Sequence, residues 1–95
     1  MRHYRYYIED LTLSGRTLDG VGGDLIVAEF EGRPELDWEL VFRSQSSEKV
    51  EPAPFDLVMN GPEGELSGPA ILVRSDGISH VFRGAGELKG FAGFI

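Results

Sequence analysis

The sequence predicts an all-β fold: a single small antiparallel β-barrel or a two-sheet β-sandwich of six to eight strands, with little or no helix. Apolar residues recur at every second position, and glycine or proline interrupts nearly every window of ten residues. Glycines inside the late strands indicate strong curvature, namely Gly68, Gly84, Gly86 and Gly90. The length of 95 residues is typical of one domain, so residues 1–95 are interpreted as a single all-β domain.

The first predicted strand, Arg2–Leu13, changes phase part of the way along its length. Tyr4, Tyr6 and Ile8 alternate in one phase, whereas Leu11 and Leu13 follow the opposite phase. One extra residue near Glu9–Asp10 returns all of them to a single buried face. We therefore expect a β-bulge there, or a strand that changes sheets.

The next two predicted strands, Asp24–Glu31 and Pro34–Arg43, form a hairpin. Glu29 and Glu31 mark the solvent side of the first strand, and acidic residues alternate with apolar ones in the second. The predicted interior side chains are Ile26, Ala28 and Phe30 in the first strand, and Leu36, Trp38, Leu40 and Phe42 in the second.

Residues 55–83 are predicted to form a three-strand meander with tight turns at 60–64 and 75–77. The middle strand, Glu65–Arg74, is apolar on both faces over Ala70–Val73, which favours a central position in the sheet. The predicted interior side chains of the outer two strands are Phe55, Leu57 and Met59, and Ile78, His80 and Phe82.

Three segments carry weaker signals. Glu87–Phe94 is interpreted as a seventh strand, or as the continuation of the sixth past a glycine kink. Ser14–Gly23 and Gln45–Pro54 are expected to be polar, flexible loops.

Composition and charge exclude several classes of protein. The chain has no cysteine, and its nine Lys and Arg against 16 Asp and Glu give a net charge of −7. Such a surface repels phosphate, so we expect neither nucleic acid nor membrane as a partner. There is no secretory signal pattern and no apolar run near the ~20 residues of a membrane helix, which favours a cytoplasmic protein.

No motif predicts catalysis, a metal or a cofactor. His80, paired with a carboxylate such as Asp76 or Asp56, is the best candidate for a general base, but a histidine packed in the sheet is the simpler interpretation. The acidic, glycine-rich stretch Asp19–Asp24 lacks the ligand spacing of an EF-hand. We therefore expect a protein that is not an enzyme and has neither cofactor nor metal.

The two ends of the chain are the best candidates for a protein interface. All three tyrosines lie in the basic segment 2–7, and the chain ends on apolar residues. Tyrosine and arginine are enriched at interface hot spots, although a plain edge strand that covers the core rim also explains the tyrosines. The interaction candidates are Arg2, Tyr4, Arg5, Tyr6, Tyr7, Phe91, Phe94 and Ile95.

Our first functional hypothesis is a non-enzymatic β module that self-associates or docks on a protein partner. An alternative is a carrier whose curved barrel encloses a small apolar ligand. A second alternative is an enzyme that uses His80 with a nearby carboxylate. The ligand-lining candidates of the carrier hypothesis are Phe30, Trp38, Phe42, His80 and Phe82.

Overall fold

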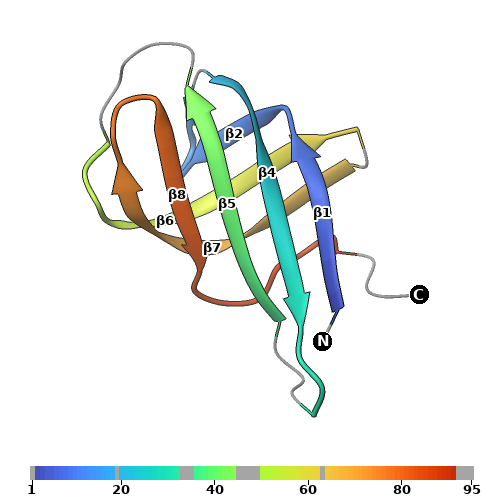
Figure 1. Cartoon of the computed structure of the whole chain (residues 1–95). Coiled ribbons are helices and arrows are strands. Elements are labelled where there is room, and N and C mark those ends of the chain that lie inside the picture. Colours follow the sequence, from blue (N-terminus) through green and yellow to red (C-terminus); the bar gives the residue numbers. More distant parts are fainter. Residues whose placement is uncertain (1, 19, 33–35, 45–49, 63, 92–95) are drawn as a thin grey trace.

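The computed structural model describes residues 2–18, 20–32, 36–44, 50–62 and 64–91. They form eight antiparallel strands in one sheet, which confirms the predicted all-β fold class (Figure 1). Among these residues no helix is present, and so none that is long and apolar enough to cross a membrane. The strands are β1 (Arg2–Ile8), β2 (Asp10–Leu13), β3 (Arg16–Leu18), β4 (Gly20–Glu29), β5 (Leu36–Ser44), β6 (Pro54–Gly61), β7 (Gly64–Ser75) and β8 (Ser79–Gly84).

The sheet curls so strongly that β1, at one end of the strand order, comes next to β2, near the other end. The strand order is β1-β4-β5-β8-β7-β6-β2-β3, and Figure 1 shows β6 and β7 crossing behind β4 and β5. Only Glu9 separates β1, which pairs with β4, from β2, which pairs with β6. The Glu9 N–H donates to the carbonyl of Asn60 at 2.7 Å. The predicted change of phase near Glu9–Asp10 is therefore confirmed, because the strand bends there and exchanges its partner.

The predicted hairpin and meander are also confirmed. β4 pairs with β5, and β6, β7 and β8 are consecutive neighbours, so β7 is central as expected. Gly77 has a φ of 93°, which the tight turn before β8 requires. The Asp76 carboxylate accepts the backbone N–H groups of Ile78 and Ser79 at 3.0 and 2.7 Å. These two hydrogen bonds lower the pKa of Asp76.

The core lies inside the curl and is supplied by every strand. Side chains alternate across each strand, so one residue in two faces inward. The buried apolar residues are Ile8, Leu11, Leu13, Leu18, Leu25, Val27, Trp38, Leu40, Phe42, Val50, Leu57, Met59, Leu66, Ala70, Leu72, Phe82 and Leu88.

The predicted interior face of β4 is wrong. Leu25 and Val27 are fully buried, because they pair across the ladder with inward-facing residues of β5. Ile26 and Ala28 are on the outer side, and Phe30 lies half-buried just beyond the end of β4. Glu29 and Glu31 do not mark the outer face of β4, because Glu29 is its last residue and Glu31 lies beyond its end.

Four smaller expectations also need correction. The predicted loop Ser14–Gly23 holds β3 and the start of β4. Ile78 lies in the turn before β8 and is 62% exposed, not interior. Within the described residues, the predicted strand Glu87–Phe94 forms only an isolated bridge, between Lys89 and Ser67. Of the predicted loop Gln45–Pro54, residues 45–49 lie outside the described part, and Pro54 already begins β6.

Candidate functional site

The outer side of β7 exposes two large aliphatic side chains. Ile71 is 46% exposed and Val73 is 49% exposed, although β7 is an inner strand of the sheet. A β-bulge explains Val73: the ladder to β8 shifts between Leu72 and Arg74, which leaves Val73 as the extra residue. In the sequence, the apolar run Ala70–Val73 predicted only a central position for this strand.

Two further valines extend this surface onto neighbouring strands. Val41 of β5 pairs with Val81 of β8, and Val81 pairs with Arg74 beside the bulge. Both valines are half-buried on the outer side, next to buried inward-facing neighbours. We call the four aliphatic residues the outer strip; it consists of Val41, Val81, Val73 and Ile71.

Charged side chains of both signs border the outer strip. The outward positions of β5 carry Asp37, Glu39, Val41 and Arg43 in order, so acids lie at one end of the strand and a base at the other. On β8, Arg83 lies opposite Glu39. Arg74 is exposed and lies beside Val81, so charged side chains of both signs adjoin the aliphatic residues of the strip, and such a mixture of apolar and polar surface is typical of interfaces.

An ion-pair network ties β1, β4 and β5 together on the same outer side. The Asp24 carboxylate lies 3.2 Å from Nη2 of Arg5, accepts a hydrogen bond from its Nε at 3.3 Å, and lies 3.7 Å from Nη1 of Arg43. The Arg5 hydrogen bond is the main reason why the pKa of Asp24 is lowered. Arg2 pairs more loosely with Glu29, at 3.9 Å. Both arginines of the N-terminal segment thus contact acids of their own sheet.

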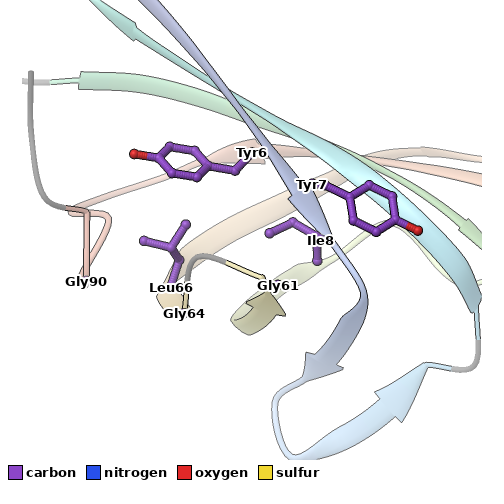
Figure 2. A pocket seen from close by; sticks show the side chains of 7 residues that line it. All are labelled: Tyr6, Tyr7, Ile8, Gly61, Gly64, Leu66 and Gly90. Atoms are coloured by element: carbon purple, nitrogen blue, oxygen red, sulfur yellow. The ribbon is translucent and has the colours of Figure 1, made fainter.

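The two terminal segments meet each other within the chain. The rings of Tyr4 and Tyr6 stack with centroids 6.4 Å apart, and Phe91 meets them edge-on at 6.0 and 5.8 Å. Figure 2 shows Tyr6 on the same side of β1 as Leu66, while Tyr7 points the opposite way. The remaining interaction candidates of the tail, Phe94 and Ile95, lie outside the described residues.

Tyr7 covers the outer side of β1, where it is 46% exposed. Its hydroxyl donates to the Val21 carbonyl at 3.1 Å, and its ring covers Gly22, where a side chain would overlap the hydroxyl.

A small hollow of about 110 Å³ lies near the opposite side of β1, between this strand, the β6–β7 turn and Gly90 (Figure 2). This volume is below the ~300 Å³ of typical small-molecule pockets.

A larger hollow of about 690 Å³ lies at the end of the curl where β5 begins and β8 ends. It is in the ~300–1,000 Å³ range of small-molecule pockets. Its described lining residues are Leu36, Asp37, Gly84, Gly86, Glu87, Leu88 and Phe91.

The ligand-lining candidates chosen from the sequence lie mostly inside the core. Phe42 and Phe82 are fully buried, and the ring of Phe82 meets that of Phe55 edge-on at 6.4 Å. Neither phenylalanine lines either of the two hollows described above, nor do Phe30 and His80. Trp38 is 4% exposed and contacts Gly84 and Gly86, which line the larger hollow.

His80 is fully buried on the inner side of β8. Its Nδ1 is 2.8 Å from Oγ of Ser75, which also accepts the backbone N–H of Val50 at 3.1 Å, and its Nε2 has no hydrogen-bond partner. Burial lowers the pKa of His80, and the charge of Asp76 partly opposes this shift. Neither Asp76 nor Asp56 is hydrogen-bonded to the imidazole, so the acid–base pair considered from the sequence is not assembled here.

Of the acidic, glycine-rich stretch Asp19–Asp24, residues 20–24 lie in strand β4 rather than in a ligand loop. Asp24 contacts two arginines, and Asp19 lies outside the described residues. Throughout the described ranges, no group of three or more histidine and acidic side chains is arranged to hold a metal ion.

Comparison with known proteins gives no relative: no family model, curated protein or solved structure matches this chain.

Proposed function

We propose that the chain is a non-enzymatic interaction module that associates with a second copy of itself through the outer strip. The observation that carries this proposal is the exposure of about half of Val73 and Ile71 on an inner strand of the sheet. Their side chains point away from the core, and contiguous apolar surface on a small protein is typical of an interaction site.

The charges around the strip favour a second copy as the partner. On β5 the outward residues Glu39 and Arg43 flank Val41. When two copies stack with these strands antiparallel about a two-fold axis at Val41, each Glu39 faces the Arg43 of the other copy. The net charge of −7 opposes unspecific contact between copies, so local pairing of this kind sets the orientation.

We assign the terminal segments to a different role. Tyr4, Tyr6 and Phe91 make their ring contacts with one another, and Arg5 pairs with Asp24. These contacts support a role in closing one end of the curled sheet. The buried position of His80 and its bond to Ser75 support a module without catalysis.

A matched pair of valine substitutions tests the proposal. Val73→Asp puts a carboxylate in the outer strip, whereas Val21→Asp makes the same change at a valine that is 57% exposed on β4, outside the strip. We expect V73D to weaken self-association, measured by sedimentation equilibrium, roughly ten-fold or more, because an unpaired carboxylate is costly to bury in an apolar contact. V21D should match the wild type.

Urea unfolding of both variants checks that the fold survives, as exposed substitutions usually permit. Equal association of V73D and V21D would show that the outer strip is not the interface.

A further inference from the structure

We propose that protonation of His80 weakens the association of two copies, because the contact between His80 and Ser75 holds in place the turn that supports the outer strip. This inference rests on the proposed function and adds a control by pH to the same surface. The imidazole is fully buried on the inner side of β8, and the next residue of this strand, Val81, belongs to the strip on the outer side.

The contact lies at the end of the β7–β8 ladder, directly beside the outer strip. Ser75 and His80 form the last pair of this ladder, and the pair before it joins Arg74 to Val81. The β-bulge that exposes Val73 lies immediately before Arg74 on β7. Loss of the last pair therefore removes the support of both strands at the point where they present Val73 and Val81.

The turn between the two strands is also fixed to the end of β5. The buried Ser44 donates from its Oγ to the carbonyl of Gly77 at 2.8 Å and from its backbone N–H to the carbonyl of Ile78 at 2.7 Å. Ser44 follows Arg43, the residue that we expect to face Glu39 of the second copy. Opening of the turn thus disturbs the strip on β5 as well as on β7 and β8.

A protonated imidazole does not fit this buried position. A neutral imidazole carries one N–H, whereas a protonated imidazole carries an N–H on both nitrogens. Nδ1 of His80 lies 2.8 Å from Oγ of Ser75, but Nε2 is buried and has no hydrogen-bond partner in the described part of the chain. Protonation therefore buries a charged donor without an acceptor, which is costly. Opening of the turn brings the imidazole into water and removes this cost.

The charged groups near His80 lie outside the core, one on each element around it. They are Arg43 on β5, Arg74 on β7, Asp76 in the turn and Glu51 beside Val50. Of these groups only Asp76 acts on the pKa of His80, and it opposes the larger effect of burial, which lowers this pKa. The pKa of Asp76 is itself lowered by the two N–H groups that it accepts, so Asp76 stays charged down to pH 5.5.

Sedimentation equilibrium of the wild type at pH 7.5 and pH 5.5, at one ionic strength, tests the proposal. Each dimer needs two copies with a closed turn, so the association constant falls with the square of the closed fraction, and we expect roughly ten-fold weaker association at pH 5.5. The net charge of −7 acts in the opposite direction, because acidic pH reduces the repulsion between copies. Weaker association at pH 5.5 is therefore not a general effect of charge.

A matched pair of histidine variants separates His80 from the rest of the chain. His80→Asn keeps an amide near the position of Nδ1 and does not titrate, whereas His3→Gln removes the other histidine, which is exposed on β1. We expect H80N to associate at pH 5.5 at least as strongly as at pH 7.5. H3Q should weaken with acidification as the wild type does.

Amide spectra of the dilute wild type provide a second measurement that does not require H80N to fold. Between pH 7.5 and pH 5.5 the signals of residues 44 and 75–81 should shift or broaden, whereas those of β2 should not. Circular dichroism should still report the intact sheet at pH 5.5.

Two kinds of result would overturn this inference and leave the proposed function in place. One is an equal response to pH in the wild type and H80N. The other is an unchanged set of signals at residues 75–81, or loss of the whole sheet at pH 5.5, because the opening is then absent or not local. A wild type that is monomeric at pH 7.5 would contradict the proposed function itself, and this inference with it.

Discussion

Trp38 joins the end of β8 to the start of β5 without a strand ladder. Its indole occupies the space that a side chain at Gly84 would need, and its Nε1–H donates to the carbonyl of Gly86. In the sequence, the glycines of the late strands indicated strong curvature, but they did not indicate which side chain contacts them. The partner is an indole that reaches across from β5, a contact that depends on how the strands are ordered.

Gly84→Ala tests this contact. The added methyl group overlaps the indole of Trp38, so the sheet must shift, and we expect a loss of about 1–3 kcal/mol in the free energy of unfolding. Urea denaturation followed by circular dichroism measures it. In a Trp38→Leu background the same substitution should cost less, because the smaller side chain leaves room. An equal cost in both backgrounds would show that the indole does not require the glycine.

His80 makes the stability of the fold depend on pH. Its pKa in the folded chain is lowered by burial, whereas in the unfolded chain it is about 6.5. Below that value the unfolded chain binds a proton that the folded chain does not, so stability falls as pH decreases. Above that value the imidazole is neutral in both states and this contribution is fully present.

We therefore expect the urea midpoint of the wild type to fall between pH 7.5 and pH 5.5. His80→Leu should remove this dependence, whatever its effect on stability at pH 7.5. His3→Gln is the control, because His3 is exposed on β1. If H80L keeps the wild-type slope, the titrating group is another residue.

At the scale of elements, the outer ion pairs tie the bent first strand to its neighbours. Asp24 of β4 contacts Arg5 of β1 and Arg43 of β5, so one carboxylate spans three adjacent strands. Its lowered pKa shows that the folded state favours the charged form. This stabilisation is present above the unfolded pKa of about 3.9 and is lost as pH falls through the folded value.

Asp24→Asn should lower the free energy of unfolding at pH 7 by roughly 0.5–1 kcal/mol, because the pairs are partly exposed to solvent. Glu29→Gln, which removes the looser pair with Arg2, should cost less. Urea unfolding at low and high salt measures both changes. If the cost of D24N does not fall at high salt, the network is not stabilised by charge.

The strands could be predicted where the two faces differ most. In β5, large apolar residues alternate with charged ones, and Trp38, Leu40 and Phe42 are buried as expected. In β4, apolar residues occupy both phases over residues 25–28, and only pairing with β5 decides that Leu25 and Val27 face inward. The alternation within β4 was therefore insufficient to predict its buried face, because that face is decided by the pairing with β5.

Short strands and glycine-rich strands were missed for a related reason. β3 has three residues, and β4 begins with glycines that have little strand propensity of their own. They form strands because β2 and β5 supply the hydrogen-bonding partners. Their state is therefore fixed by tertiary pairing rather than by local sequence.

At the scale of the whole molecule, a curled sheet has one buried side and one exposed side. The tyrosines near the start of the chain and the apolar residues at its end predicted interaction through the chain ends. The structure brings Tyr4, Tyr6 and Phe91 together at one end of the curl. The run Ala70–Val73 suggested burial on both faces, yet the outer side chains of Ile71 and Val73 are half exposed. The sequence of one strand cannot distinguish an outer face that is buried from one that is exposed, since it does not show whether a second layer covers the sheet.

Association of two copies through the outer strip must change the mass of the wild-type chain in solution. Light scattering after size-exclusion chromatography gives this mass over a wide range of concentration. We expect this mass to rise from that of the monomer towards twice that value, with no further increase, because a two-fold contact closes on itself. A monomer at every concentration would contradict it.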